Sequence, residues 1–251
     1  EFITDEDNWL PPDNYQEEPH VGLAHRTSPT NIGIALVSIL SAKDLGYIST
    51  SQALYRFENT FSTLKKLETW KGHFYNWYDT RTLEPLRPRY VSSVDSGNLA
   101  CYLILLKQGI DELLSRPLVG QEMISGLKDT IILDFEKNGS SIPSIINMLE
   151  ASDHITLTEW KLTLNQLGNV GYYTDKQIDE FKMEMDKIVP WVDLLLNAPK
   201  SILGENGLSQ EVKENFHRLM DSLNKDFSLR RILDDYHDIL DNLSKVILSL
   251  R

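Results

Sequence analysis

The sequence has little cysteine, because Cys101 is the single one among 251 residues. One thiol cannot form an internal disulfide, and it cannot build the thiolate cage of a structural zinc site. Cys101 lies within the apolar run Leu99–Leu103, and we expect it to pack in the hydrophobic core. Stability must therefore come from a packed core, for which a chain of this length is sufficient.

Positive charge is also scarce. The chain carries 25 Lys and Arg residues against 37 Asp and Glu residues, a formal net charge of -12. This surface repels a polyphosphate backbone, so we do not expect nucleic acid as a partner. The glycines form no phosphate-binding loop, and His20, His25 and His73 lack the spacing of metal ligands. The sequence therefore predicts no cofactor and no metal ion.

Long apolar runs are missing as well. The most apolar stretch, Ile32 to Leu40, has about half the length that a bilayer-spanning helix needs. We therefore expect no membrane contact by this segment itself. The first residues contain neither a basic start nor an apolar signal core, and they lack an initiator Met. This start is typical of a piece of a longer protein.

Helical periodicity follows an irregular, aromatic-rich arm over residues 1–28. Ser28 and Pro29 form a helix start, apolar residues continue at helical spacing, and Gly46 ends this first helix. A second helix is predicted over residues 50–67 and a third over residues 95–115. The loop between them is rich in aromatic residues and holds at most a small β-hairpin near residues 73–92.

The second half of the chain changes in character after Arg116 and Pro117. It is rich in Leu, Ile and acidic residues, which favours a helical bundle over residues 118–251. Helices are predicted near residues 119–138, 142–151, 158–167, 175–196, 209–224 and 229–250, with Pro190 kinking or splitting the fourth. We therefore predict an all-α protein built from antiparallel helical hairpins, with an aromatic-rich segment over residues 1–117.

The unusual residues of the first half converge on one end of these helices. Helices joined by a short connection run antiparallel, so the first and third helices point the same way. The aromatic-rich arm and loop both lead into the N-termini of these two helices. Aromatic rings pack against the flat C–H faces of a pyranose, and Asp, Asn, Arg and His bind its hydroxyls. This combination is typical of a carbohydrate-binding site.

Local roles compete with ligand binding at several of these positions. Phe74 and Trp77 could pack as core under a loop. Asp95 and Ser96 could be helix caps, and Asp79 could form an Asx turn with the residues that follow it.

Three runs in this segment carry a specific resemblance. His25–Gly33, Gly72–Leu83 and Pro88–Leu99, in this order, closely resemble the central segment of cyclic β-1,2-glucan synthases. The resemblance covers about Asp7 to Leu114. It implies the front part of an (α/α) toroid like that of glucoamylase-type hydrolases, in the region that closes the β-1,2-glucan ring by transglycosylation. It further implies a position on the cytoplasmic face of a membrane-anchored bacterial enzyme, whose remaining domains are partners of this segment.

The hypothesis that follows concerns substrate binding. Eight residues gathered at the shared end of the helices are predicted to line or support a cleft for β-1,2-glucan or a related oligosaccharide: His25, Arg26, Tyr75, Trp77, Tyr78, Asp79, Arg89 and Asp95. None of the acidic residues lies in a motif that marks the acid or the nucleophile of a retaining transglycosylase. We expect these catalytic carboxylates beyond residue 251, and the isolated chain to be inactive.

Two other functions remain open at this point. A stand-alone glucoamylase-like glycoside hydrolase would have to use Asp79 and Asp95 as its catalytic pair. A helical structural or interaction module without catalytic activity is suggested by the second half, where one apolar stripe could join another helix. The stripe consists of Ile232, Tyr236, Ile239, Leu243, Val246 and Leu250, and it could equally pack on its own bundle.

Overall fold

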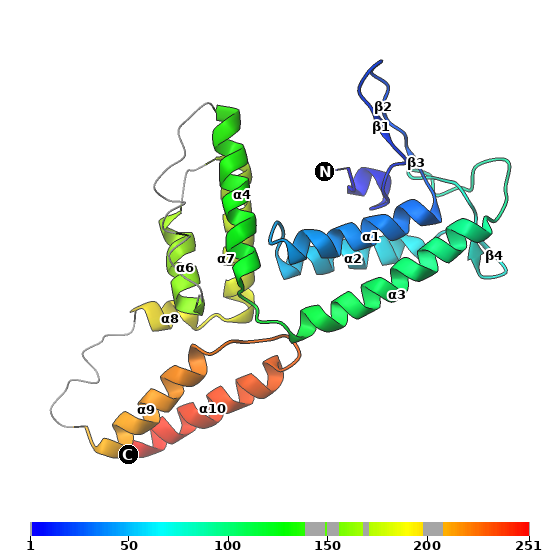
Figure 1. The fold of residues 1–251 in the computed structure, drawn as a ribbon. Helices are drawn as coiled ribbons and strands as arrows, with labels where there is room; N and C mark the ends of the chain where they lie inside the picture. The colour runs from blue at the N-terminus through cyan, green and yellow to red at the C-terminus, as the bar shows by residue number, and fades with distance from the viewer. Residues whose placement is uncertain (1, 139–148, 150–155, 168–170, 198–207, 251) are drawn as a thin grey trace. The chain divides into compact units, whose positions relative to one another are not determined.

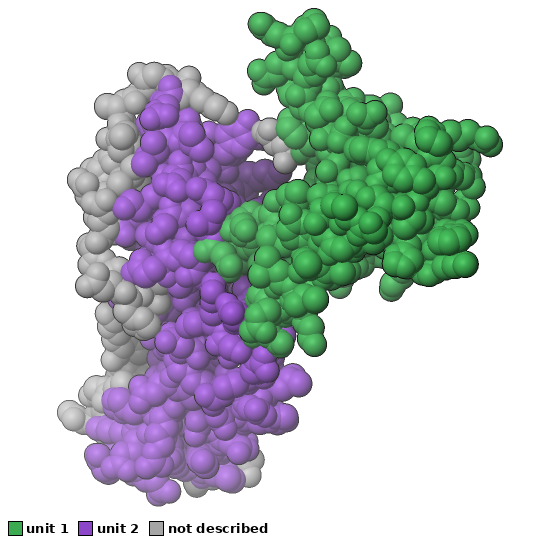
Figure 2. Space-filling model, turned by 45° about the vertical axis from the view of Figure 1, so that its right-hand side comes forward, with its two compact units in different colours: residues 1–44, 50–111 green, residues 45–49, 112–251 purple. Residues whose placement is uncertain are grey.

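The computed structural model describes residues 2–138, 149, 156–167, 171–197 and 208–250. Helices predominate within these ranges and each strand has only two residues, which confirms the predicted all-α class (Figure 1). The chain divides into two compact units, shown in Figure 2. The first unit comprises residues 1–44 and 50–111, and the second comprises residues 45–49 and 112–251. The sequence analysis predicted a boundary between two domains after residue 117. The assignment of these domains and the toroid remain predictions.

Three helices build the first unit: α1 (Pro29–Asp44), α2 (Thr50–Leu64) and α3 (Ser93–Ser115), whose last turn belongs to the second unit. Ser28 caps α1, because its Oγ accepts a hydrogen bond from the backbone N–H of Asn31 at 3.2 Å. In the same way Ser92 Oγ accepts from the N–H of Asp95 at 3.1 Å. The third helix therefore begins before Asp95, which lies in its first turn instead of capping it.

Helices α1 and α3 run in the same direction, as the sequence predicted. Thr30 of α1 bonds to Asp95 of α3, Gly33 lies against Tyr102, and Leu40 lies against Gly109. Contact positions thus advance together along both helices, which is possible only for parallel neighbours. The N-termini of α1 and α3 consequently lie at the same end of the unit.

Short β pairings hold the arm and the long loop in place. In the arm, η1 (Asp5–Asp7) precedes the antiparallel pair β1 (Tyr15–Gln16) and β2 (Gly22–Leu23). In the loop, β4 (Thr69–Trp70) pairs with β5 (His73–Phe74). The pair that matters for the site joins the two segments, because β3 (Arg26–Thr27) is antiparallel to β6 (Tyr78–Asp79). The hairpin predicted near residues 73–92 is thus found at the start of the loop, over residues 69–74, whereas β6 pairs with the arm.

The second unit is helical throughout its described elements. These are α4 (Gln121–Asn138), α6 (Leu157–Gln166), α7 (Tyr172–Ile188), α8 (Val192–Asn197), α9 (Gln210–Leu223) and α10 (Ile232–Ser249). Pro190 separates α7 from α8, which confirms the predicted interruption. Trp160, Phe181 and Phe227 lie in its buried core. The helix predicted near residues 142–151 lies outside the described residues, apart from Leu149.

The prediction that Cys101 packs in the core is wrong. Its side chain is exposed on α3, next to the exposed Ile104 and Leu105. Helix α3 buries Leu99 and Leu106, which lie on another face of the helix. The apolar run around Cys101 therefore extends around the helix instead of marking one buried face.

The apolar stripe predicted on α10 is only partly buried. Ile239 and Val246 lie in the core of the second unit, and Ile232 packs against that core. Leu243 and Leu250 are exposed. The stripe therefore serves mainly to pack α10 on its own unit. Among the helices that the structure describes, none combines the length and the hydropathy needed to cross a bilayer.

The close approach of α1 and α3 at Gly33 generates a stability prediction. A Cβ added there would lie 2.5 Å from Tyr102 Cδ2 and 3.0 Å from Tyr102 Cβ, so turning the ring cannot relieve the clash. Overpacking costs roughly 1–3 kcal/mol, more than the roughly 1 kcal/mol gained by removing a helical glycine. Gly33→Ala should therefore lower the midpoint of thermal unfolding, measured by far-UV circular dichroism.

A second helical glycine supplies the control. Nothing lies within 4 Å of a Cβ added at Gly97 of α3, so Gly97→Ala should leave the midpoint unchanged or raise it. Equal midpoints for the two variants would contradict the close packing of α1 against α3.

Candidate functional site

A chain of side-chain hydrogen bonds joins the N-terminal ends of α1 and α3. Thr30 Oγ1 donates to Asp95 Oδ1 at 2.7 Å, and Asn98 Nδ2 donates to Thr30 Oγ1 at 3.1 Å. The second carboxylate oxygen of Asp95 accepts from Nδ2 of the buried Asn76 at 2.9 Å. Both Asp95 oxygens are thus engaged by donors from other segments, so this carboxylate fixes the loop against the helix ends.

Asn76 extends the network to two aromatic residues of the loop. Its Oδ1 accepts from the Tyr90 hydroxyl at 2.7 Å and from Trp77 Nε1 at 2.8 Å. This amide orientation gives each of its atoms a complementary partner, since the oxygen faces two donors and the nitrogen faces a carboxylate. The Tyr90 ring is exposed, whereas Trp77 is half-buried. Asn76 therefore positions one aromatic ring that can reach a ligand.

Arg26 connects the arm to the same loop. Its Nε and Nη2 donate to Asp13 Oδ2 at 3.0 and 2.8 Å, and its guanidinium lies 5.0 Å from the centroid of the Trp77 ring. Asp13 Oδ1 accepts in turn from Asn31 Nδ2 at 3.3 Å. Half of the Arg26 side chain is exposed. The guanidinium is therefore oriented by a carboxylate and a ring at a half-exposed position.

His25, which directly precedes β3, belongs to a second cluster of hydrogen-bonded side chains. Arg81 Nη2 lies 2.8 Å from His25 Nε2, and a guanidinium can only donate, so Nε2 accepts. Nδ1 then carries the proton and donates to Asp7 Oδ1 at 2.8 Å. The same buried carboxylate accepts from the Thr80 hydroxyl. The imidazole is thus saturated by neighbours within the protein, which gives His25 a supporting position.

Asp79 forms the predicted Asx turn. Its Oδ1 accepts from the backbone N–H groups of Arg81 and Thr82 at 2.9 and 2.8 Å. Burial acts to raise the pKa of this carboxyl, but the hydrogen bonds from Thr82 and Arg81 hold it below its ordinary value. Asp79 therefore stays ionised and shapes the turn that follows β6.

The pKa of Asp95 is lowered in the same sense. Burial acts to raise it, and hydrogen bonds from Ser92 and Thr30 more than offset that effect. A general acid in a glycosidase needs a raised pKa. Asp79 and Asp95 thus both lack the property that a catalytic acid requires, which argues against the pair expected for a stand-alone hydrolase.

A third group of contacts in the loop involves Tyr75, Tyr78 and Arg89. Tyr78 is fully buried, its hydroxyl donates to the Glu68 carbonyl at 2.6 Å, and it accepts from the Tyr75 N–H at 2.7 Å. Burial raises the pKa of Tyr78 to about 12. The Arg89 guanidinium lies 5.8 Å from the Tyr75 ring centroid and donates to Glu68 Oε1 at 3.1 Å. Tyr78 therefore supports the loop, while Arg89 remains accessible.

The structure brings the predicted residues together in the first unit but separates their roles. Four of the predicted residues are at least partly accessible: Arg26, Arg89 and the half-buried Trp77 and Tyr75. Internal hydrogen bonds hold the other four: His25, Tyr78, Asp79 and Asp95. Sequence reasoning missed several polar residues that organise the site: Asp7, Asp13, Asn31, Asn76 and Thr80. Asn31, Asn76 and Thr80 lie inside the resembling runs, which is the signal that could have identified them. Within the described residues, no group of His, Cys, Asp and Glu side chains could hold a metal ion.

Comparison with known proteins decides the relationship. A stretch of 103 residues is 55% identical to Cyclic beta-(1,2)-glucan synthase NdvB of Rhizobium meliloti (strain 1021). The predicted resemblance is confirmed. The match covers 41% of this chain but only 4% of the synthase, so the chain shares a small part of that protein. No protein-family model matches the chain.

The network at Asp95 predicts a pH dependence of stability. Folding lowers the pKa of Asp95. The ionised Asp95 carboxylate therefore makes its full contribution to the free energy of unfolding above the pKa that Asp95 has in the unfolded chain, near 3.9. That contribution is lost as pH falls through the lower folded value. Asp95→Asn should therefore destabilise the chain by about 1 kcal/mol at neutral pH, with a difference that shrinks in acid. Scanning calorimetry across this pH range measures the effect.

Glu58→Gln removes one exposed carboxylate from α2 and serves as the control. Its acid unfolding should follow that of the wild type. A constant difference between Asp95→Asn and the wild type at all pH values would contradict the role of the ionised Asp95 carboxylate.

Proposed function

We propose that the first unit contributes part of a β-1,2-glucan-binding cleft to a cyclic β-1,2-glucan synthase, in the region that closes the glucan ring. The observation that carries this proposal is the 55% identity over 103 residues to the Rhizobium meliloti synthase. The ligand is accordingly β-1,2-glucan or a related oligosaccharide. The same relationship supports the view that the unit is the front part of an (α/α) toroid.

The exposed groups at the shared helix ends suit such a ligand. Arg26 presents N–H donors from a fixed orientation, and Tyr90 presents an exposed ring whose hydroxyl is anchored on Asn76. A pyranose needs both kinds of contact, since its hydroxyls seek donors and acceptors and its C–H faces pack on rings. Internal hydrogen bonds fix these groups before a sugar arrives, which lowers the entropic cost of binding.

The role proposed for this unit is binding and positioning of the glucan. Asp79 and Asp95 are ionised and engaged by internal donors, so neither supplies the proton that glycosidic cleavage requires. The acid and nucleophile would come from other parts of the full-length enzyme, which are the partners of this unit. We further propose that the segment lies on the cytoplasmic face of a membrane-anchored bacterial enzyme.

Calorimetric titration with linear β-1,2-gluco-oligosaccharides tests the proposal. The wild-type chain should bind them in preference to β-1,3- and β-1,4-linked oligosaccharides of equal length. Trp77→Ala removes the ring that supports Arg26 and the N–H bound to Asn76, so it should weaken binding roughly 3- to 10-fold. Circular dichroism would verify that the variant is folded.

The first unit contains a matched control pair. Lys71 Nζ lies 4.7 Å from the Trp70 ring centroid in the β4–β5 hairpin, much as the Arg26 guanidinium lies over Trp77. Trp70→Ala removes a comparable exposed contact, and it should leave the affinity unchanged. Equal losses in both variants, or no preference for the β-1,2 linkage, would contradict the proposed cleft.

A further inference from the structure

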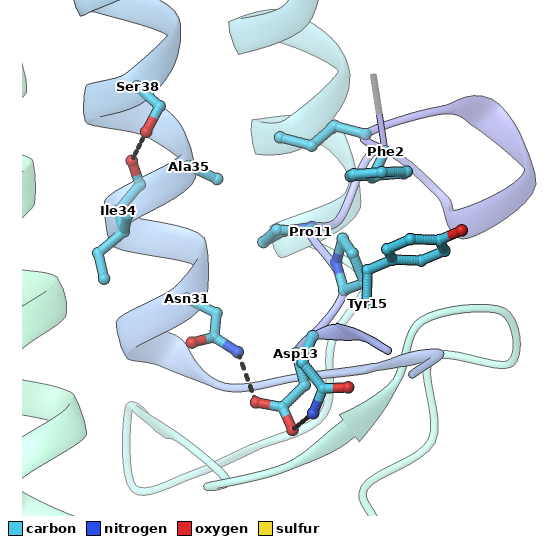
Figure 3. Close-up of a pocket in the computed structure, with 11 residues that line it drawn as sticks. Phe2, Pro11, Asp13, Tyr15, Asn31, Ile34, Ala35 and Ser38 are labelled. Atoms are coloured by element: carbon cyan, nitrogen blue, oxygen red, sulfur yellow. Dashed lines mark hydrogen bonds between the residues drawn. The ribbon is translucent and has the colours of Figure 1, made fainter. Parts of the chain in front are cut away.

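An open groove of about 460 Å³ lies between α1 and the N-terminal arm, outside the set of residues predicted from the sequence. One wall is formed by Ile34, Ala35 and Ser38 of α1, and the other carries the aromatic side chains of Phe2 and Tyr15 (Figure 3). The volume falls in the usual range for small-molecule sites. The groove is therefore large enough to accept a sugar ring.

The aromatic wall has the geometry of a sugar platform. The rings of Phe2 and Tyr15 are stacked, with centroids 5.3 Å apart and an interplanar angle of 19°. Both side chains are about two-fifths exposed, at 42% and 43%. Stacking on Phe2 therefore orders the Tyr15 side chain in the free protein, which lowers the entropic cost of binding a ligand. Part of the ring pair remains exposed to a ligand.

Polar groups collect at one end of the groove. Asn31 Nδ2 points at the Asp13 carboxylate, as Figure 3 shows, so Asn31 Oδ1 is turned away from it. Asn14 Nδ2 donates to the other oxygen of Asp13 at 3.3 Å. Within the described residues, neither amide oxygen accepts a side-chain hydrogen bond. Two acceptors are therefore free to bind sugar hydroxyls.

Asp13 lies between this groove and the Arg26–Trp77 cluster, which consists of the Arg26 guanidinium and the Trp77 ring beneath it. Its Oδ1 faces Asn31 in the groove, and its Oδ2 receives the Arg26 guanidinium that lies over Trp77. One carboxylate thus forms the wall between the two sites.

We propose that the groove is an additional subsite for one end of a gluco-oligosaccharide that also contacts the Arg26–Trp77 cluster. Tyr15 stacks on a pyranose ring of this ligand, and Asn31 accepts a hydrogen bond from one of its hydroxyls. The inference rests on the proposed function, since it takes glucan as the ligand. It adds that the groove sets the length of glucan that the first unit holds.

Calorimetric titration with linear β-1,2-gluco-oligosaccharides of increasing length, from the disaccharide upward, tests the subsite. Affinity of the wild-type chain should rise with length until the groove is filled. Tyr15→Ala should bind the longer ligands roughly 3- to 10-fold more weakly, and the shortest ones unchanged. Tyr15→Phe keeps the ring and should retain most of the length-dependent gain.

Val21→Ala serves as the control, because this exposed residue lies just before β2 in the same hairpin and does not line the groove. Binding that depends on Trp77 but does not change in Tyr15→Ala would overturn the subsite alone. An equal loss for short and long ligands in Tyr15→Ala would also overturn it. No binding of any length by the wild type would overturn the proposed function and, with it, this inference.

Discussion

The site depends on one constraint, the side-by-side placement of the N-termini of α1 and α3. Thr30 and Asp95 hold the two ends together with a 2.7 Å hydrogen bond, and Gly33 and Gly109 allow the helices to approach along their length. Each helix end brings a long segment with it, the arm before α1 and the loop before α3. The β3–β6 pair can therefore form, and polar residues from distant parts of the sequence reach the same place.

Carboxylates organise this end of the unit. Asp7, Asp13 and Asp95 each accept hydrogen bonds from two or more side chains, at least one of which comes from another segment. A carboxylate offers up to four acceptor sites, so one such residue can tie several segments together. Hydrogen bonds from Ser92 and Thr30 keep the pKa of Asp95 low despite burial, and a low pKa does not suit proton donation.

Local sequence signals predicted the elements but could not predict their long-range partners. Ser28, Gly46 and helical spacing located α1, and its short connection to α2 led to the parallel placement of α3. Asp7 and Asp13 could not be identified, because their partners are set by the pairing of the arm with the loop. Cys101 was misplaced because an apolar run in a helix reaches more than one face. His25 and Tyr78 were predicted as site residues, but only their contacts reveal that they support the arm and the loop.

The most direct test of the account uses the five tryptophans as internal probes. Their indole N–H signals can be followed by nuclear magnetic resonance while linear β-1,2-gluco-oligosaccharide is added. The Trp77 signal, whose proton is bound by Asn76, should shift with ligand concentration. The signals of Trp160 and Trp191 in the second unit should stay unchanged. A Trp77 signal that does not move at saturating ligand, or shifts confined to the second unit, would contradict a glucan-binding site at the ends of α1 and α3.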